Sequence, residues 1–297
     1  MKYGVFGVAL VIVVIWGTCL PYEQAIRAEG ATTNTIRISL VSSLFRDTPD
    51  WLVKKLSTPL MLLMEKATGL TGQLQPSGDA TTLARKLEEG STDLAVFHGF
   101  EFAWVQQKDP KLTPLVVILN QQPTLYANLV VKDGADFASC ADLKGCTLAI
   151  PQMTRGHCYL FLDQCCGSAK PKEYFDRITT PPDAEDALED VISGEAQVAL
   201  IDKIALEAYS AAKPARSKKL RVLKQSEPIP AVVIAYRAGM VPEKLLSRFR
   251  DGMIVAHETP GSRDLLSLCR ITRFAPVPQN YEKQLKSSLK AYPPPRQ

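Results

Sequence analysis

Residues 79–98 read DATTLARKLEEGSTDLAVFH, a pattern that predicts an amphipathic helix, a glycine stop and a short buried strand. The helical spacing of apolar residues ends before Gly90, a residue type that readily adopts the left-handed conformation that stops helices. The apolar run Leu94–Phe97 has the length of a strand, and His98 is the first polar residue after it. Ligands bind where the strands of open α/β sheets end, so His98 is a candidate ligand contact.

The same pattern returns at residues 183–202, which read DAEDALEDVISGEAQVALID. When the two helix starts are aligned, Gly90 corresponds to Gly194 and His98 corresponds to Asp202. A repeated helix–strand unit indicates two similar α/β lobes, each with a polar side chain at a strand end. We therefore expect His98 and Asp202 to face a common cleft.

The composition is that of an ordinary globular protein. The 297 residues are 46% hydrophobic and 22% charged, which is enough to bury one large core or two medium ones. The formal net charge is +4, and no block of like charges occurs. Such a weak and dispersed positive charge gives no support to a nucleic-acid-binding function.

The N-terminus has the layout of a secretory signal peptide over residues 1–28. Lys2 precedes an apolar run from Val5 to Trp16, which is shorter than the roughly 20 residues needed to span a bilayer. Small residues near Ala28 suit cleavage. We expect a periplasmic or otherwise exported protein, with an uncleaved, membrane-anchored form as the alternative.

Six of the seven cysteines follow Cys19 and form an even set that suits an oxidising compartment. Spacing alone does not assign their pairing. Cys140 and Cys146 bracket a turn and are the nearest plausible pair. Cys158 and Cys165 lie too far apart along an expected helix for a direct bond.

Strands alternate with helices along the chain, which predicts an α/β fold. The strand run 125–131 follows the strand 115–119 with almost no room for a helix, so we expect the chain to cross from one lobe to the other there. The apolar strand 231–236 is the expected return. The expected organisation is lobe 1 at 35–123, lobe 2 at 124–228, and the second part of lobe 1 with a C-terminal tail at 229–297.

The segment 154–157 is the best anion-binding candidate on physical grounds, because it ends the loop 151–157 that leads into an expected helix. A helix N-terminus offers free backbone N–H groups and the positive end of the helix dipole. Thr154 could add a hydroxyl, and Arg155 could bind an oxyanion through two parallel hydrogen bonds. The alternative is an ordinary capped helix with an exposed arginine.

The other candidates have structural alternatives of their own. His98 could simply be packed at the end of the sheet, and Glu101 could only complement the dipole of the helix that it begins. Asp202 could accept a ligand amine or cap the following helix. Aromatic residues that could wall the pocket are Phe45, Phe97, Phe100 and Tyr126, of which Phe97 also suits the core.

Metal binding and catalysis receive little support from the sequence. His157-Cys158 with Cys165-Cys166 is a set of soft ligands, but zinc sites usually place close ligand pairs two to four residues apart. Export also favours disulfides, so we expect no metal and no cofactor. The motifs of hydrolases, metalloproteases, P-loop proteins and dinucleotide-binding proteins are absent, so no enzyme is expected, although His98, Asp202 and a cysteine could in principle form a catalytic group.

Five segments, in this order and at this spacing, resemble the phosphate, phosphite and phosphonate substrate-binding proteins of bacterial ABC transporters. They read VSSLF at 41–45, EKATG at 65–69, DLAVFHGFEFAW at 93–104, ADLKGCTLAIPQMTRGH at 141–157 and QSEPIPAVVIAYR at 225–237. The resemblance covers roughly residues 36–292. It implies a two-lobed, type II periplasmic-binding fold that closes on a ligand by hinge motion.

The resemblance also implies an oxyanion held between the lobes by strand-end loops and a helix N-terminus of the second lobe. The candidate ligand-binding residues are Ser42, Ser43, Phe45, His98, Gly99, Glu101, Tyr126, Thr154, Arg155, Gly156, His157 and Asp202. The family's serine-threonine-serine-glycine run is here Met153-Thr154-Arg155-Gly156, and the tyrosine of its glycine-proline-x-x-tyrosine motif is replaced by Phe102. These departures keep the fold and leave the ligand open.

We therefore expect a monomeric exported protein that captures a small oxyanion, phosphate- or phosphonate-like, and delivers it to an ABC transporter permease. A sensor or scaffold with the same fold but without transport is the alternative. An enzyme on this fold is the third and weakest reading.

Overall fold

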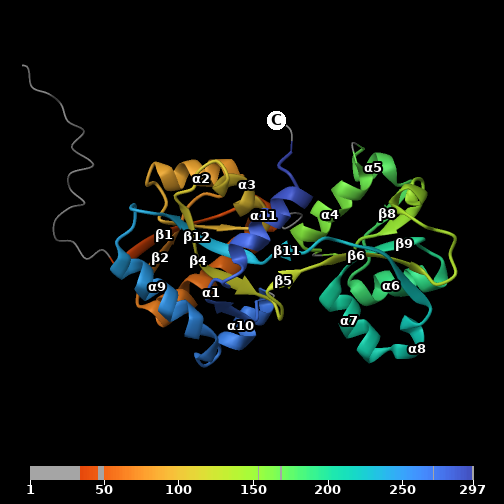
Figure 1. The fold of residues 1–297 in the computed structure, drawn as a ribbon. Coiled ribbons are helices and arrows are strands. Elements are labelled where there is room, and N and C mark those ends of the chain that lie inside the picture. Colours follow the sequence, from red (N-terminus) through yellow and green to blue (C-terminus); the bar gives the residue numbers. More distant parts are fainter. Residues whose placement is uncertain (1–33, 46–49, 153, 168, 270, 296–297) are drawn as a thin grey trace, which may run out of the picture. The chain divides into compact units, whose positions relative to one another are not determined.

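A mixed six-stranded sheet forms the centre of lobe 1 in the computed structural model (Figure 1), which describes residues 34–45, 50–152, 154–167, 169–269 and 271–295. Its strand order is β13-β4-β12-β3-β1-β2. The strands are β1 (Thr35–Leu40), β2 (Thr71–Leu74), β3 (Leu94–Phe97), β4 (Leu112–Leu119), β12 (Val232–Arg237) and β13 (Arg273–Ala275). β1 is parallel to β2 and β3, whereas β12 is antiparallel to both β3 and β4. The late strand β12 thus lies between two early ones, so lobe 1 is built from two chain segments.

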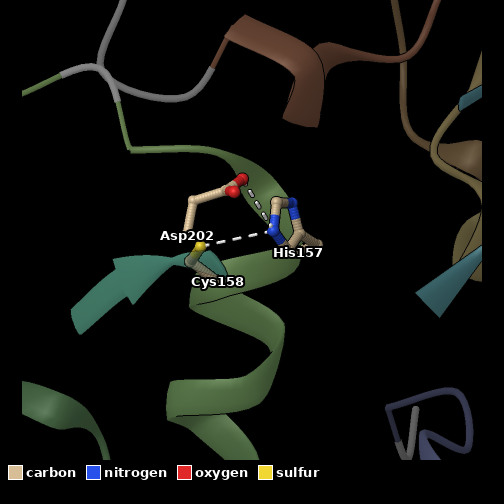
Figure 2. A group of neighbouring side chains, drawn as sticks. All are labelled: His157, Cys158 and Asp202. Atoms are coloured by element: carbon tan, nitrogen blue, oxygen red, sulfur yellow. Dashed lines mark hydrogen bonds and ion pairs between the residues drawn. The ribbon is translucent and has the colours of Figure 1, made fainter. Parts of the chain in front are cut away.

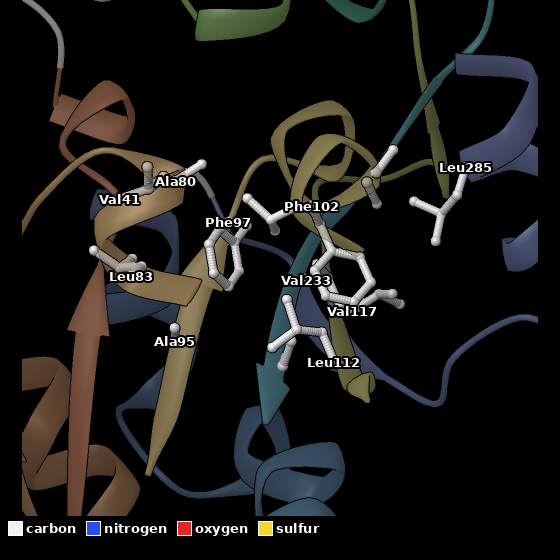
Figure 3. Packing of buried hydrophobic residues seen from close by; sticks show 14 of the residues in the cluster. Val41, Ala80, Leu83, Ala95, Phe97, Phe102, Leu112, Val117, Val233 and Leu285 are labelled. Atoms are coloured by element: carbon white, nitrogen blue, oxygen red, sulfur yellow. The ribbon is translucent and has the colours of Figure 1, made fainter. Parts of the chain in front are cut away.

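Helices cover both faces of this sheet. One face is covered by α2 (Ala80–Glu88), α3 (Gly99–Gln106) and α11 (Tyr281–Ala291), and the other by α1 (Asp50–Thr68), α9 (Glu243–Val255) and α10 (Ser262–Leu268). Because side chains alternate along a strand, β3 serves both cores: Ala95 and Phe97 pack into the first core, and Leu94 and Val96 pack into the second. Figure 3 shows the first core, where Phe97 lies close to Phe102 of α3, with ring centroids 5.8 Å apart.

Lobe 2 has a five-stranded sheet in the order β10-β6-β9-β7-β8. Its strands are β6 (Ala127–Lys132), β7 (Thr147–Ala149), β8 (Arg177–Thr179), β9 (Val198–Asp202) and β10 (Leu220–Gln225). Its helices are α4 (Gly156–Cys166), α5 (Pro171–Tyr174), α6 (Ala184–Ser193), α7 (Lys203–Ala212) and α8 (Pro214–Ser217). Two short strands, β5 (Thr124–Leu125) and β11 (Ile229–Pro230), pair antiparallel where the chain passes between the two sheets.

The repeated sequence pattern forms the same structural unit twice. Asp79 caps α2 by accepting the Thr82 N–H at 2.7 Å, and Asp183 caps α6 by accepting the Asp186 N–H at 3.0 Å. Each helix is followed by a glycine with positive φ and then by a strand that is parallel to its neighbour, β1 or β7. The two units therefore end, as the sequence predicts, at His98 and Asp202.

The proposed signal peptide, residues 1–28, lies outside the described residues. Within the part of the chain that the structure describes, no helix combines the length and the apolar character needed to cross a bilayer.

The cysteine arrangement differs from the expected one. The sulfur of Cys140 lies 2.6 Å from that of Cys165, whereas Cys146 faces the Asp142 carbonyl at 3.8 Å. The sequence leaves the pairing open, with Cys140 and Cys146 as the nearest plausible pair, whereas the structure places Cys140 beside Cys165. Cys165 is on α4, which packs over the segment that contains Cys140, and this tertiary contact leaves no mark in the sequence spacing.

We expect Cys140 and Cys165 to form a disulfide in an oxidising compartment, with a disulfide-bearing oxidoreductase accepting the two thiol protons and two electrons. The intact protein should then be lighter by two hydrogen atoms than its reduced form, and a non-reducing peptide map should link these two residues. Cys140→Ser should lower the free energy of unfolding by about 3 kcal/mol, a typical value for a loop of this size. Cys146→Ser is the matched control. A map that links Cys140 to another cysteine would contradict the assignment.

Candidate functional site

Polar side chains from the two lobes meet near the start of α4. Arg155 immediately precedes this helix, and Asn120 follows strand β4 of the other lobe. In the amide orientation that satisfies both groups, the Asn120 side-chain oxygen accepts a hydrogen bond from Arg155 Nη1 at 2.6 Å. Asn120 is absent from the sequence-predicted site, although it is the first polar residue after an apolar strand, the same signal that selects His98.

The turn that precedes α4 is closed by the side-chain hydroxyl of one of its own residues, Thr154. Arg155 is the N-cap residue, with extended backbone angles and no side-chain cap bond. The Thr154 hydroxyl donates to the Pro151 carbonyl at 2.6 Å, so it closes the turn. The N–H groups of Gly156 and His157, in the first turn of α4, have no partner within the helix. The start of α4 therefore places N–H groups that the helix itself does not use beside a guanidinium group.

Gly156 and His98 bring the two lobes into close approach. A Cβ atom on Gly156 would lie 2.5 Å from His98 Nε2, so any side chain at this position would collide with the imidazole. His98 is buried and stacks on Phe100, with ring centroids 5.1 Å apart. Burial lowers the pKa of His98 to about 4, so the ring is neutral at pH 7. His98 is therefore packed at the sheet end and also faces the other lobe, and its contact with a ligand stays a prediction.

Glu101 accepts hydrogen bonds from Ser43, a candidate site residue. Ser43 donates to both carboxylate oxygens of Glu101 at 2.8 Å, and the Glu101 side chain is buried. Burial raises the pKa of Glu101 to about 7 in spite of the Ser43 hydrogen bond. Glu101 lies in the first turn of α3, where a carboxylate complements the helix dipole. It also positions Ser43.

Asp202 performs the capping role and also contacts α4 (Figure 2). Its Oδ1 accepts the Ile204 N–H at 2.8 Å at the start of α7, while Oδ2 lies 3.2 Å from His157 Nε2 and 3.8 Å from Arg155 Nη1. Burial acts to raise the pKa of Asp202, but the neighbouring His157 and Arg155 outweigh it and the pKa lies below its usual value.

Cys158 lies 3.5 Å from the same His157 nitrogen, which gives a cluster of three donor types (Figure 2). In a catalytic Cys–His–Asp group, the cysteine and the carboxylate contact different nitrogens of the imidazole, whereas here both face Nε2. Burial also raises the pKa of Cys158 well above its usual value, which favours an unreactive thiol. The donor atoms of His157, Cys158 and Asp202 all lie within 4.8 Å of one another, so this set could hold a metal ion.

Two cavities adjoin these residues. The larger has a volume of about 750 Å³ and is lined in part by Asn120, Arg155, Cys158 and Asp202. The smaller, about 320 Å³, begins at Ser43, His98, Arg155 and Gly156 and continues along the apolar face of the lobe 1 sheet.

The cavities separate the sequence-predicted residues into two groups. Those that line one or both cavities are Ser43, Phe45, His98, Thr154, Arg155, Gly156, His157 and Asp202. The remaining four do not line them: Ser42 is exposed, Gly99 packs on the Pro230 and Ala231 carbonyls, Glu101 holds Ser43, and Tyr126 lies under the Lys203 ammonium group at 4.8 Å.

Two α/β lobes joined by paired strands, with strand-end residues and a helix start facing each other, define the class of two-lobed periplasmic-binding folds. The chain belongs to the family of ABC transporter, phosphonate, periplasmic substrate-binding proteins, whose model matches residues 48–281. The α/β two-lobed fold and the family resemblance predicted from sequence are therefore confirmed. A search of curated proteins finds no match.

Solved structures with this fold include XAC2383 from Xanthomonas citri bound to ATP, with a TM-score of 0.54 and 17% identity over 87% of this chain and 97% of that chain. PhnD1 from Prochlorococcus marinus (MIT 9301) in complex with methylphosphonate has a TM-score of 0.53 and 11% identity over 87% of this chain and 98% of that chain. At these identities the similarity shows the fold alone.

Proposed function

We propose that this protein captures an organic oxyanion of the phosphonate type between its lobes and delivers it, as a monomer, to an ABC transporter permease. The observation that carries the proposal is the position of Arg155 directly before α4, in both cavities and opposite Asn120. A guanidinium group and the free N–H groups of a helix start together favour an anion with several oxygens. The paired strands β5 and β11 are the proposed hinge.

The apolar cavity supports an organic substituent on the anion. Leu40, Ile118 and Val232 lie on central strands of the lobe 1 sheet, yet they are only partly buried because they face this cavity. Ligand pockets are mostly apolar and carry a few polar groups that fix the orientation of the ligand. An alkylphosphonate would place its anionic end near Arg155 and its chain along these side chains, whereas inorganic phosphate would leave the apolar part unused.

Calorimetry with methyl-, ethyl- and butylphosphonate tests both parts of the proposal. Each added CH₂ that becomes buried should tighten binding by about 0.8 kcal/mol, or roughly fourfold. Val232→Phe should fill the cavity and remove this dependence on chain length, whereas Val222→Phe, on the exposed side of β10, should not. Equal affinities for the three phosphonates would contradict the placement of the alkyl chain in the apolar cavity. No binding of any of these phosphonates would overturn the proposed function.

A further inference from the structure

We propose that His157, Cys158 and Asp202 form a binding site for a divalent transition metal ion of the zinc type. The three side chains offer an imidazole nitrogen, a sulfur and a carboxylate oxygen, and these donor atoms all lie within 4.8 Å of one another. His157 Nε2 lies 3.2 Å from Asp202 Oδ2 and 3.5 Å from Cys158 Sγ. All three are residue types that bind zinc.

These separations match the edges of a zinc coordination tetrahedron. With Zn–N and Zn–O bonds of about 2.0 Å and a Zn–S bond of about 2.3 Å, tetrahedral angles place nitrogen and oxygen about 3.3 Å apart and nitrogen and sulfur about 3.5 Å apart. The two shortest separations in the cluster agree with these values. The third pair, Cys158 and Asp202, lies within 4.8 Å, compared with about 3.5 Å between oxygen and sulfur in the tetrahedron, so one ion fits when these two side chains move closer together.

The groups that face Asp202 Oδ2 are His157 Nε2 at 3.2 Å and Arg155 Nη1 at 3.8 Å. The oxygen is buried, and among the described residues neither contact has the geometry of a full hydrogen bond. A buried carboxylate oxygen without a hydrogen bond is costly, and coordination of a cation would remove that cost. A bound thiolate and carboxylate would also neutralise the charge of a divalent ion.

The surrounding structure suits a site with an open coordination position. His157 and Cys158 are fixed in the first turn of α4, and Asp202 is held by the Ile204 N–H through its other oxygen. Cys158 and Asp202 both line the 750 Å³ cavity, which provides a route of entry. Three protein ligands leave the fourth tetrahedral position free, as in zinc sites that bind an exogenous ligand.

In the sequence, the apparent partner of His157-Cys158 is the pair Cys165-Cys166, whose spacing does not suit zinc. Cys165 instead faces Cys140, and the third donor comes from the end of β9. The inference does not depend on the proposed function, because metal binding can be measured without any oxyanion.

Zinc and cobalt binding to chelator-treated protein provide the test. After addition of zinc and dialysis, elemental analysis should find one zinc ion per chain. The cobalt form should show a thiolate-to-cobalt charge-transfer band and the visible bands of a tetrahedral ion. Cys158→Ser should remove the charge-transfer band, and His157→Gln and Asp202→Asn should each weaken zinc binding by roughly tenfold or more.

Matched controls exist within the chain. Cys146→Ser and His257→Gln change residues outside the cluster and should keep full binding. The Asp202→Asn variant can still cap α7, and the Cys158→Ser exchange is nearly isosteric, so circular dichroism should show both variants folded. A wild-type protein that retains no zinc, or a Cys158→Ser variant with an unchanged cobalt spectrum, would overturn the site. Methylphosphonate calorimetry on the metal-free protein reports separately on the proposed function.

Discussion

Replacing Arg155 with alanine is expected to weaken methylphosphonate binding by roughly 10- to 100-fold, since hydrogen bonds to charged groups contribute about 1.5–3 kcal/mol. The Arg155 side chain is 21% exposed and is held between Asn120 of one lobe and Asp202 of the other. Its orientation is therefore set before a ligand arrives, which reduces the entropy lost on binding.

Calorimetry on three variants separates charge from geometry. Arg155→Lys keeps the charge but loses the planar pair of donors, so its affinity should lie between those of the wild type and Arg155→Ala. Arg177→Ala removes an arginine that donates to the Glu195 carbonyl elsewhere in lobe 2, and its affinity should match the wild type. Unchanged affinity in Arg155→Ala would show that Arg155 does not bind the ligand.

Replacing Glu101 with glutamine should stabilise the protein at alkaline pH and leave its stability nearly unchanged at pH 4. The carboxyl group has a pKa of about 7 in the folded protein, chiefly because of burial, whereas its pKa in the unfolded chain is about 4.3. Between these two values the folded state keeps a proton that the unfolded state has lost. Wild-type stability therefore falls as the pH rises through this window, by up to about 4 kcal/mol.

Denaturant unfolding at pH 4, 5.5 and 8 measures this effect. The amide introduced by Glu101→Gln cannot ionise, and its oxygen can still accept the Ser43 hydrogen bond, so the gap between variant and wild type should widen with rising pH. Glu89→Gln, at an exposed carboxylate paired with Arg85, is the control and should show no such trend. A gap that stays constant from pH 4 to pH 8 would show that Glu101 has an ordinary pKa in the folded protein.

Local signals predicted much of the fold. The caps Asp79 and Asp183, the glycine stops and the apolar strands are set by neighbouring residues, so their positions can be read from the sequence. The crossing between the lobes has a weaker signal, because a strand that follows another with no room for a helix can either form a hairpin or enter the other lobe.

Contacts between distant segments account for what the sequence did not predict. The Asn120–Arg155 contact, the approach of Cys140 to Cys165 and the addition of Asp202 to His157 and Cys158 all depend on how α4 packs. No spacing rule encodes such contacts. For Tyr126 the sequence signal suggests a role that the structure does not show. An aromatic residue near the crossing between the lobes suits a pocket wall, yet the Tyr126 ring lies under the Lys203 ammonium group.

The central claim is that an oxyanion binds beside Arg155 at the amino end of α4. A crystal structure of the protein with butylphosphonate tests it most directly. The claim predicts that the phosphonate oxygens accept hydrogen bonds from the Arg155 guanidinium group and the first N–H groups of α4, with the alkyl chain along Ile118 and Val232. A phosphonate bound away from Arg155 would contradict it.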